Sequence, residues 1–567
     1  MRPTDTAPRI QSDQDAAWRA RLVAAKDRFA AALPDAAARQ RRILAEILTD
    51  NADTAFGREH GFARLRTIDD YRAAVPLRTH QEYRPWLTRS AAGEARVLTA
   101  EPPRLFFTTS GSTGDRKRVP VTESFVRRVY LPFFQAAMGV PAQYHPDAFG
   151  RGAVTLNLRH DRLARPALSD SGRPSLGPSQ ADLRGGFGVD LEEPGSRAPW
   201  AELPAALDDQ AYLDKLYVRV RTAAEHDVRS VIGHNPTMIA MLPELIAQWW
   251  PRLIEDIRDG TCLGAPGGTP APARAAELER RAGGRPTPAA IWPHLSLLYC
   301  WTSGVASLYL PRLKDAYGPS VTILPTPPAA SEGPVGVPVD RHPSAGPLAV
   351  SCVLYEFVDA SRDVAPDSPT LLHDELEEGR DYHVVLSHLG GLYRYVLGDL
   401  AHVVDHVDGV PRVEYAGRAT LSDTVGERLR EPHVVRALRE ASRVAGIGVT
   451  NVTCRPENGP GRPHHTLVVA PDRPLPPARL PAFQDLVDKE LCRVSHDYRH
   501  VRSTGALGAA RVVPVAASAF TEHWHHRLAA GMRPPEIKDQ VFQHDPAAWA
   551  RLRDHGRHST HTEKRPE

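Results

Sequence analysis

Short apolar runs alternate with amphipathic segments through the middle of the chain, and this alternation constrains the fold more than any other feature. Six runs have the length and composition of β-strands, at 104–107, 153–158, 228–234, 295–301, 321–325 and 348–358. The clearest amphipathic segment between them, 236–257, spaces its apolar residues as a helix does. Strands that alternate with helices form a mostly parallel sheet whose faces the helices cover. The sequence therefore predicts an α/β fold.

The length of 567 residues exceeds what one hydrophobic core supports, which indicates two or more domains. Beyond residue 417 the pattern predicts a smaller unit, with helices near 432–444 and 481–495 and strands near 465–470 and 511–516. We expect a large N-terminal domain at 1–416, a hinge near 417–423, a small mobile α+β domain at 417–552 and a flexible tail at 553–567. Two further segments, 164–199 and 263–292, are rich in Pro, Gly, Ser and Ala and are expected to be long surface loops.

Charge, cysteine content and hydropathy exclude several classes of protein. The 70 Lys and Arg residues nearly balance the 68 Asp and Glu residues, so no net charge favours nucleic acid or an anionic membrane. The five cysteines are scattered without a CxxC pair, which argues against a disulfide framework or a structural zinc site. The first residues lack the apolar core of a signal peptide, and no window is long enough to span a bilayer. We expect a soluble cytoplasmic protein.

The stretch FTTSGSTGDRK at 107–117 follows the first predicted strand and concentrates glycine and hydroxyl residues before a lysine. Gly111 and Gly114 permit backbone amides to converge on an anion, and Lys117 adds a mobile positive charge. Further hydrogen-bond donors come from the hydroxyls of Ser110, Ser112 and Thr113. The Walker A pattern fails because Arg116 stands where that pattern requires glycine. On residue chemistry alone, a phosphate-binding loop and an ordinary polar turn both remain open.

TTSGSTGDRK resembles the phosphate-binding loop of the adenylate-forming superfamily, and other motifs narrow the resemblance to one branch. NADTAFGREHGF (51–62) and YRAAVPLRTHQEYRPWL (71–87) are similar to the N-terminal signature of the acyl acid amido synthetases known from the auxin-responsive Gretchen Hagen proteins of plants. The chain is identified as a member of this family, of its bacterial type, over residues 35–545. The resemblance implies a large N-terminal adenylate-forming domain with mixed sheets, and a smaller mobile C-terminal domain.

PPAASEG (327–333) resembles the second ATP motif of the family. The resemblance implies that Glu332 is a ligand of the Mg²⁺ that accompanies the triphosphate, and that Ser331 lies beside the nucleotide; oxygen ligands suit Mg²⁺. Relatives usually place a tyrosine against the adenine where this chain has Pro328, which has no π-face. Taken alone, a Ser-Glu pair at a strand end is also common in surface loops.

GLYRYVLGDL (391–400) is the most specific match and resembles the Tyr-Arg-x-x-Gly-Asp motif of the family. The resemblance implies that Asp399 accepts hydrogen bonds from the ribose hydroxyls, while Gly398 lets the backbone come close. The flanking segments YEFVD (355–359) and VEYAGR (413–418) are also similar to family strands, although a hairpin turn ending in Gly-Asp is the alternative for an isolated motif. Arg418 resembles the arginine beside the interdomain hinge, which reaches ribose or phosphate.

Lys538, in PPEIKDQ (534–540), lies at the distance from the C-terminus expected of the mobile catalytic lysine of the family. That lysine stabilises the charge that develops at the α-phosphate. The flanking residues differ, because relatives have Gln two residues before the lysine and Pro-Arg after it, whereas this chain has Glu536 and then Asp539-Gln540. An isolated lysine near a C-terminus is most often a solvated surface residue, so these flanks leave the role of Lys538 open.

The resemblance as a whole implies an ATP- and Mg²⁺-dependent ligase, with Lys117 and Lys538 acting in catalysis. Such an enzyme joins a small-molecule carboxylic acid to AMP and transfers the acyl group to an amine or amino acid, as a monomer. Two alternatives stay open: acyl transfer to the thiol of CoA, and a degenerate relative that binds a nucleotide or a partner without turnover. Pro328, the flanks of Lys538, and GER (426–428) where relatives favour GEK all favour the second alternative.

Other motifs carry less information. The clusters HWHHR (523–527) and PHH (463–465) lack a paired carboxylate or cysteine group, so we do not expect a metal site there. No GxSxG pattern follows a predicted strand, which argues against a Ser-His-Asp hydrolase. GGFGVDLEE lies in a loop-rich stretch rather than in a βαβ setting, so a dinucleotide site is not expected.

Overall fold

The computed structural model describes residues 6–109, 117–159, 166–204, 207, 211–458, 461–534 and 537–559, with side chains described from 14 to 555. The chain divides into two compact units, each formed by several segments. Unit 1 comprises Met1–His234, Ile246–Trp301 and Ser320–Tyr415. Unit 2 comprises Asn235–Leu245, Thr302–Pro319 and Ala416–Glu567. The chain therefore passes between the units more than once, so each unit is discontinuous in sequence.

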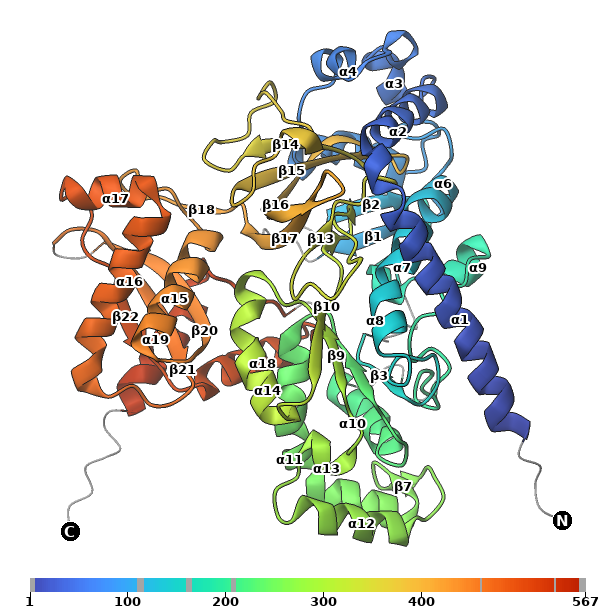
Figure 1. The fold of residues 1–567 in the computed structure, drawn as a ribbon, viewed down its shortest axis with the longest axis vertical. Coiled ribbons are helices and arrows are strands. Elements are labelled where there is room, and N and C mark those ends of the chain that lie inside the picture. The colour runs from blue at the N-terminus through green and yellow to red at the C-terminus, as the bar shows by residue number, and fades with distance from the viewer. Residues whose placement is uncertain are drawn as a thin grey trace. The chain divides into compact units, whose positions relative to one another are not determined.

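Helices of unit 1 lie mainly in its first and middle thirds (Figure 1). They are α1 (Thr6–Ala30), α2 (Ala36–Asp50), α3 (Ala55–Glu59), α4 (Ile68–Ala74), α5 (His80–Ala91), α6 (Glu123–Phe125), α7 (Leu131–Ala137), α8 (Gly139–Tyr144), α9 (Leu183–Phe187), α10 (Tyr212–Ala223), α12 (Pro272–Ala282) and α13 (Pro288–Ile291). Helix α11 (Pro236–Asp259) begins in unit 2 and ends in unit 1.

Two four-stranded sheets form in the N-terminal part of unit 1. One has the order β2-β1-β5-β4 and contains β1 (Leu105–Thr109), β2 (Lys117–Val121), β4 (Ala167–Leu168) and β5 (Pro174–Leu176). The other has the order β10-β9-β6-β3 and contains β3 (Thr155–Asn157), β6 (Ser230–Ile232), β9 (Leu297–Cys300) and β10 (Thr322–Pro325). All neighbours in the second sheet are parallel, as the alternation of strands and helices in the sequence predicts. An apolar cluster joins this sheet to α1 and α7 through Trp18, Phe134 and Tyr299.

The largest sheet of unit 1 is antiparallel and was not predicted as such from the sequence. Its order is β13-β17-β16-β15-β14, formed by β13 (Gly346–Pro347), β14 (Leu354–Asp359), β15 (Asp381–His388), β16 (Leu392–Val407) and β17 (Val410–Arg418). Consecutive strands from β14 to β17 are joined without crossover helices, so the alternation rule does not apply to this part of the chain. Tyr355, Leu386 and Tyr393 of this sheet belong to the largest apolar cluster of the unit.

The two segments predicted as long loops are partly regular. The segment 164–199 contains β4, β5 and α9, and 263–292 contains α12, α13 and part of the short hairpin formed by β7 (Thr261–Cys262) and β8 (Ala265–Pro266). The prediction of structureless loops was wrong because Pro occupies the first turn of α12 and of α13, where proline is compatible with a helix. Leu278 of α12 and Ile291 of α13 are fully buried, so these helices pack against the unit.

Unit 2 is built on the three-stranded sheet β20-β21-β22, from β20 (Val449–Glu457), β21 (His464–Pro471) and β22 (Arg511–Pro514). Its helices are α14 (Leu310–Tyr317), α15 (Glu431–Ala445), α16 (Leu480–Val494), α17 (His496–Ser503), α18 (Ser518–Ala529) and α19 (Pro546–Ser559), and its remaining elements are the 3-10 helix η6 (Gly304–Tyr309) and the hairpin β18 (Leu421–Ser422) and β19 (Leu429–Arg430). Leu438, Leu467 and Leu491 belong to one apolar core, which Leu308 of η6 completes. Helix α19 buries Trp549 and Leu552 against β21 and continues to Ser559, past the start of the tail expected from 553.

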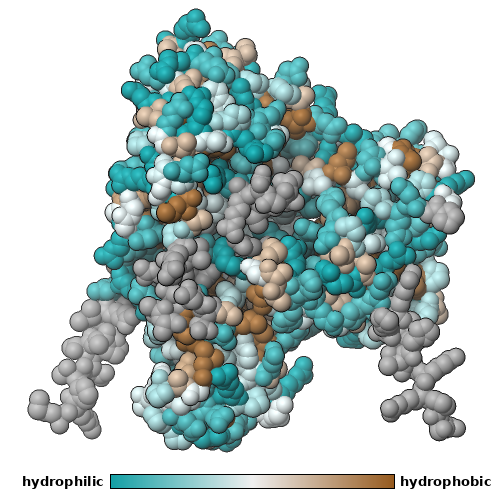
Figure 2. All heavy atoms as spheres, turned by 180° about the vertical axis from the view of Figure 1, so that it is seen from behind, coloured by the Kyte–Doolittle hydropathy of each residue, from teal (hydrophilic) through white to brown (hydrophobic). Residues whose placement is uncertain are grey.

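The surface of the chain is mainly hydrophilic on the face drawn in Figure 2, where apolar residues form small separate groups. Exposed large apolar side chains include Tyr144, Leu168, Val425 and Val444, which are far apart in the sequence. Within the described ranges, no helix is both long and apolar enough to cross a membrane.

Candidate active site

The first strand pair of unit 1 holds the two ends of the predicted phosphate loop side by side. Thr109 of β1 lies opposite Lys117 of β2 in antiparallel register, and the buried Phe106 and Phe107 fix β1 in the core. The predicted loop residues Ser110, Gly111, Ser112, Thr113 and Gly114 lie outside the described residues. The structure establishes that β1 and β2 are antiparallel neighbours and that Lys117 starts β2.

Ser331 and Glu332 occupy the turn of a second, very short hairpin. The hairpin consists of β11 (Ala329–Ala330) and β12 (Gly333–Pro334), with Ala330 opposite Gly333. Ser331 is partly exposed, whereas Glu332 is 4% exposed. The carboxylate of Glu332 therefore points inward, towards Lys117 and Tyr395.

His388 holds this turn in place from the end of β15. Its Nε2 donates to the backbone carbonyl of Glu332 at 2.7 Å, and its Nδ1 accepts from the N–H of Gly390 at 2.9 Å. These two bonds require the proton on Nε2. Burial lowers the pKa of His388 to about 4, so the ring stays neutral near neutral pH. His388 was not among the residues predicted from the sequence, because its role depends on a contact 56 residues away.

Lys117 and Glu332, which are 215 residues apart in the sequence, meet in the structure. The Nζ of Lys117 lies 3.4 Å from Oε1 of Glu332, and the hydroxyl of Tyr395 donates to the same oxygen at 3.2 Å. Burial and the negative charges of Glu332 and Asp399 raise the pKa of Tyr395 well above its usual value, so the phenol keeps its proton and donates. The structure thus brings together a cation, a buried carboxylate and a phenol.

Asp399 lies in an irregularity of β16 that the sheet register makes visible. Val385 pairs with Val396, but His383 pairs with Leu400, so β16 carries additional residues between these pairs. Gly398 adopts φ +84° within this bulge, and nothing lies within 4 Å of the position that a Cβ would take. Bulges redirect side chains near functional sites. The Oδ1 atom of Asp399 is buried, and the charge of this carboxylate reaches Tyr395.

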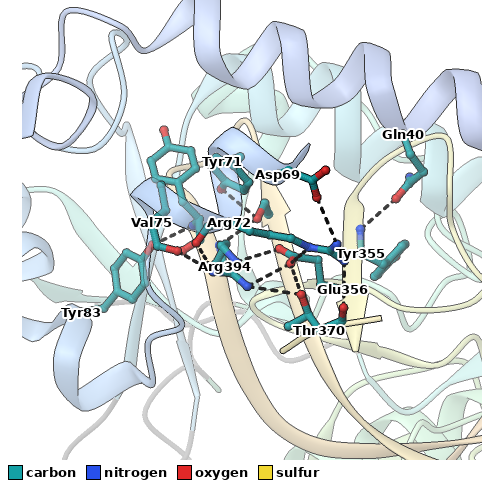
Figure 3. A network of polar contacts seen from close by, with 12 residues as sticks. Gln40, Asp69, Tyr71, Arg72, Val75, Tyr83, Tyr355, Glu356, Thr370 and Arg394 are labelled. Carbon is teal, nitrogen blue, oxygen red and sulfur yellow. Dashed lines mark hydrogen bonds and ion pairs between the residues drawn. The ribbon is translucent and has the colours of Figure 1, made fainter. Parts of the chain in front are cut away.

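Arg394, in the same motif, has a structural position rather than a place in this cluster (Figure 3). Its guanidinium binds both oxygens of Glu356, at 3.0 and 3.1 Å, and also donates to the carbonyl of Val75 at 2.6 Å. Arg72 of α4 and Thr370 donate to the same carboxylate. This buried network ties α4 to β14 and β16. Removing one partner of such a pair costs about 3–5 kcal/mol, because the other charge stays buried.

An aromatic pair lies at the carboxyl edge of the parallel sheet. Trp301 follows β9 and stacks on His234, which follows β6, with ring centroids 6.0 Å apart and an interplanar angle of 11°. Thr326 follows β10 in the same edge, and its Oγ1 is buried with no hydrogen-bond partner among the described residues. Ligands of parallel α/β sheets bind at this edge. These residues were missed from the sequence, although their positions directly after strands were a usable signal.

Pro328 has a backbone role in the turn that carries Glu332. Its carbonyl accepts from the N–H groups of Val335 and Gly336, both at 3.0 Å. The ring of Pro328 offers no π-face, whereas the aromatic pair Trp301 and His234 lies at the carboxyl edge of the parallel sheet. The substitution at 328 therefore leaves the turn intact while removing one stacking surface.

Lys538 and Arg418 belong to unit 2, whereas Lys117, Ser331, Glu332 and Asp399 belong to unit 1. Lys538 is exposed and lines a pocket of unit 2 together with Thr237, Tyr309, Arg527 and Asp539. Arg418 is partly exposed, and its N–H donates to Oε2 of Glu431 at 2.9 Å.

The donor set of unit 1 fits Mg²⁺ held together with phosphate oxygens. Magnesium in nucleotide sites takes one or two carboxylates and completes its shell with phosphate oxygens and water. Glu332 supplies one buried carboxylate beside Lys117. Within the part of the chain that the structure describes, no three His, Cys, Asp or Glu side chains form a complete protein cage for a metal.

Comparison with protein families identifies the chain. The model of the GH3 family N-terminal domain matches residues 25–323, more than half of the 567 residues, and the models of the central and C-terminal domains match 346–418 and 432–547. The chain belongs to the GH3 family. The resemblance proposed from the motifs is thereby confirmed, and the three GH3 models follow one another in the order of the motifs.

Curated GH3 relatives are similar over most of their length. A probable indole-3-acetic acid-amido synthetase GH3.12 of Oryza sativa subsp. japonica is 25% identical, covering 89% of this chain and 90% of the relative. A jasmonoyl–L-amino acid synthetase GH3.5 of the same organism is 22% identical, covering 72% of this chain and 75% of the relative. These identities extend well beyond the phosphate loop.

Solved structures show the same fold. The acyl acid amido synthetase AtGH3.15 in complex with 2,4-DB matches with a TM-score of 0.76 at 17% identity, covering 94% of this GH3 chain and 96% of that one. A 2-hydroxyisobutyryl-CoA ligase in the postadenylation state matches with a TM-score of 0.52 at 14% identity. The predicted fold class, a large adenylate-forming α/β domain with mixed sheets and a smaller C-terminal domain, is confirmed.

Proposed function

We propose that this chain is an ATP-dependent acyl acid amido synthetase, a ligase that activates a carboxylic acid and transfers the acyl group to the amine of an amino acid. The observation that carries the proposal is the meeting of Lys117, Glu332 and Tyr395, with Asp399 on the strand of Tyr395. These residues come from separate motifs that occur in GH3 order. The names of the relatives, which specify acids joined to amino acids, support the substrate classes.

The reaction has two steps. A carboxylate oxygen of the acid forms a bond to the α-phosphorus of ATP, while the bond from that phosphorus to the pyrophosphate oxygen breaks. The amine nitrogen then bonds to the acyl carbon, the bond from that carbon to the AMP oxygen breaks, and the nitrogen loses a proton. No protein nucleophile is required, so positioning and electrostatic stabilisation carry the catalysis.

Each residue of the cluster has a role that its geometry supports. Lys117 starts the strand after the phosphate loop, so its ammonium neutralises the triphosphate; the pairing with Glu332 orients it. Asp399 accepts hydrogen bonds from ribose, beside the open space at Gly398. Mg²⁺ supplies further positive charge when bound, and Glu332 is its protein ligand. The remaining proposed contacts are those of Ser331 beside the nucleotide, the loop Ser110, Gly111, Ser112, Thr113 and Gly114 with the phosphates, Arg418 with ribose or phosphate, and Lys538 with the α-phosphate.

The domain organisation and setting form part of the same proposal. The small domain contains the residues after 416 together with the two earlier segments of unit 2. It moves between the two steps, and this movement excludes water from the activated acyl group. Gly417 adopts φ +153° at the end of β17, and the position of a Cβ there lies 2.9 Å from Cβ of Glu431, so glycine is required at this junction. We propose that the enzyme acts as a monomer in the cytoplasm.

Acid-dependent exchange of labelled pyrophosphate into ATP tests the first step, over a panel of carboxylic acids and with hydroxylamine to trap the activated acyl group. We expect exchange with at least one acid and its loss in Asp399→Ala, while Asp367→Ala, which removes an exposed carboxylate of the same unit, retains the rate. Absence of exchange with every acid would contradict the proposal and indicate a nucleotide-binding relative without turnover.

Product analysis tests the second step. With an active acid, the panel of amino acids and CoA should yield an amide, identified by its mass, and AMP in equal amount. A CoA thioester in place of the amide would overturn the choice of acceptor while leaving the first step intact. The fold alone does not separate these outcomes, because a CoA ligase shares it.

A further inference from the structure

The segment that carries Lys538 is held at the edge of the unit 2 sheet. The N–H of Cys454 donates to the carbonyl of Val541 at 2.6 Å, and the N–H of Gln543 donates to the carbonyl of Cys454 at 3.0 Å. Phe542 forms a parallel bridge with Cys454 of β20. The chain is therefore fixed three residues after the lysine by strand-type pairing.

A cluster of buried polar side chains holds the residues on both sides of Lys538. Asn235 donates from Nδ2 to the carbonyl of Ile537 at 2.6 Å, and its Oδ1 accepts from the N–H of Thr237, at the start of α11, at 3.0 Å. On the other side, Oδ2 of Asp539 accepts from the hydroxyls of Tyr309 at 2.8 Å and Thr237 at 3.3 Å. Lys538 thus lies between two anchored neighbours.

The contact to Asp539 joins three separate elements of unit 2. Besides Thr237 of α11 and Tyr309 of η6, Asn451 of β20 donates from Nδ2 to Oδ1 of Asp539 at 3.3 Å and to the hydroxyl of Tyr309 at 2.7 Å. Thr237, Tyr309 and Asn451 are each at most 5% exposed. We call Asp539 with these three residues the latch.

The chemistry of the latch argues for positioning rather than for stability. All three donors to Asp539 are neutral. Burial raises the pKa of this carboxyl, while the hydrogen bonds from these donors and then the charge of Arg527 oppose the increase. A carboxylate that is withdrawn from water and bound by neutral donors costs more free energy than an amide or a hydroxyl would. What the carboxylate adds is two acceptor oxygens that fix three donors at once. Asp539 is also a position at which this chain departs from the Pro-Arg pattern that follows the lysine in relatives.

We propose that Asp539 is a positioning residue for the proposed activation step, which fixes the backbone of Lys538 through the latch so that the ammonium is held in the pocket of unit 2. The inference rests on the proposed function, because it assigns Lys538 to charge stabilisation at the α-phosphate. Where relatives have Pro-Arg after the lysine, this chain thus has a carboxylate, Asp539, that binds the latch. Lys538 lines the same pocket as the latch residues Thr237, Tyr309 and Asp539.

The test is a double-mutant cycle between Asp539 and Lys538, measured as acid-dependent exchange of pyrophosphate with ATP. Asp539→Asn keeps the shape but presents an amide donor to the donors of the latch. We expect the exchange rate to fall about tenfold or more, with the KM for ATP changed less than about twofold, because the ammonium of Lys538 loses its position but the nucleotide site is unchanged. In the Lys538→Ala background the same substitution should have no further effect.

Matched variants keep the test informative if Asp539→Asn is unstable. Tyr309→Phe and Thr237→Val each remove one donor, and each should lower the rate in the parent but not in Lys538→Ala. Asp485→Asn makes the same chemical change on the exposed face of α16 and should leave the rate and the melting temperature unchanged. An equal loss of rate in both backgrounds, or no loss in the parent, would overturn the latch.

The outcomes also separate the latch from the function on which it rests. If the parent enzyme shows no exchange with any acid, the proposed function and the latch are both overturned. If the parent is active and Lys538→Ala has no effect, the role of Lys538 and hence the latch are overturned, but the proposed synthetase activity is retained. An active parent that is slowed by Lys538→Ala but not by Asp539→Asn, Tyr309→Phe or Thr237→Val overturns the latch alone.

Discussion

At the residue scale, neighbouring charges and burial decide what each carboxylate of this chain does. Glu332 is buried beside Lys117 and Tyr395 and keeps a position from which it can face a metal or a phosphate. Glu356 is saturated by Arg394, Arg72 and Thr370 and serves the packing of the sheet (Figure 3). The two residues have the same functional group, so their roles follow from their partners alone.

Glu332→Gln tests the first of these roles. The amide keeps the turn and an acceptor for Tyr395 but removes the negative charge, so we expect the exchange rate to fall about 100-fold and the Mg²⁺ concentration at half-maximal rate to rise. A titration of Mg²⁺ in the exchange assay measures both. Glu378→Gln, an exposed glutamate of unit 1, is the control and should behave as the parent. An unchanged Mg²⁺ dependence in Glu332→Gln would contradict the assignment.

Glu427 of the GER sequence provides a test of stability against pH. Its carboxylate accepts from His465 at 2.8 Å and from the N–H groups of Thr424 and Val425, both at 2.9 Å. Despite the opposing effect of burial, these bonds lower the pKa of Glu427 to about 2. Because the pKa is depressed in the folded state, the stabilisation is complete above about pH 4.5 and is lost as the pH falls towards 2.

The expected loss is about 3 kcal/mol of the free energy of unfolding, as the pH decreases through this range. Urea unfolding followed by circular dichroism at several pH values measures it. Glu427→Gln should be less stable near neutral pH and should lose this part of the pH dependence. A variant with the same acid limb as the parent would show that other carboxylates are responsible. Glu427 thus has a structural position within unit 2, where its side chain and that of His465 are fully buried.

At the scale of elements, irregularities within β16 place the functional groups more than the regular parts of the sheet do. The bulge that contains Gly398 interrupts the register between Val396 and Leu400 and precedes Asp399. The second irregularity of the β15–β16 pairing, near Ser387, brings Arg394 to φ +48° and directs its side chain into the network with Glu356. Regular alternation in the sequence contains no sign of these shifts.

Gly398→Ala separates the effect of backbone strain on stability from the effect of an added methyl group on access of ATP to the site. The φ of +84° makes any side chain there unfavourable by about 1 kcal/mol, although no atom lies within 4 Å of the added carbon. Gly409→Ala, in the β16–β17 turn with φ +80° and equally open space, is the matched control. Both should lower the free energy of unfolding by about 1 kcal/mol, but only Gly398→Ala should raise the KM for ATP. Equal KM values in the two variants would place the nucleotide elsewhere.

At the scale of the whole molecule, the chain builds each unit from segments that are distant in sequence. Unit 2 contains Asn235–Leu245 and Thr302–Pro319 besides everything after Tyr415. Leu308, 5% exposed, and the partly buried Val305 complete the core that contains Leu438 and Leu491. A boundary drawn at one point of the sequence, such as 416/417, therefore leaves part of the core behind.

The isolated fragment 417–567 should be less stable than unit 2 in the complete chain. Loss of Leu308 from the core alone exposes the apolar surface it covered, and burying one such side chain is worth about 1.5–3 kcal/mol. The fragment also lacks Thr237 and Tyr309, the partners of Asp539. Urea unfolding can be followed by the fluorescence of Trp524 and Trp549. It should show a lower midpoint for the fragment than for the complete chain. Equal midpoints would show that the C-terminal segment folds independently.

The sequence by itself determined the family, the fold class, the parallel sheet and the identity of the motif residues. These follow from local patterns: apolar runs of strand length, amphipathic spacing, and short motifs in a fixed order. It also predicted Lys117 and Glu332 as members of one site, and the structure brings them within 3.4 Å.

Only the tertiary structure decided which motif residues lie together and which support the fold. It assigned Arg394 to packing, added Tyr395 and His388 to the cluster, and gave Asp539 three partners from other segments. The sequence could not show this, because the partners are distant in the chain. His388 and Glu332 are 56 residues apart, and Thr237 and Asp539 are 302 residues apart. Hydrogen bonds and burial depend on distances in space, which local periodicity does not encode.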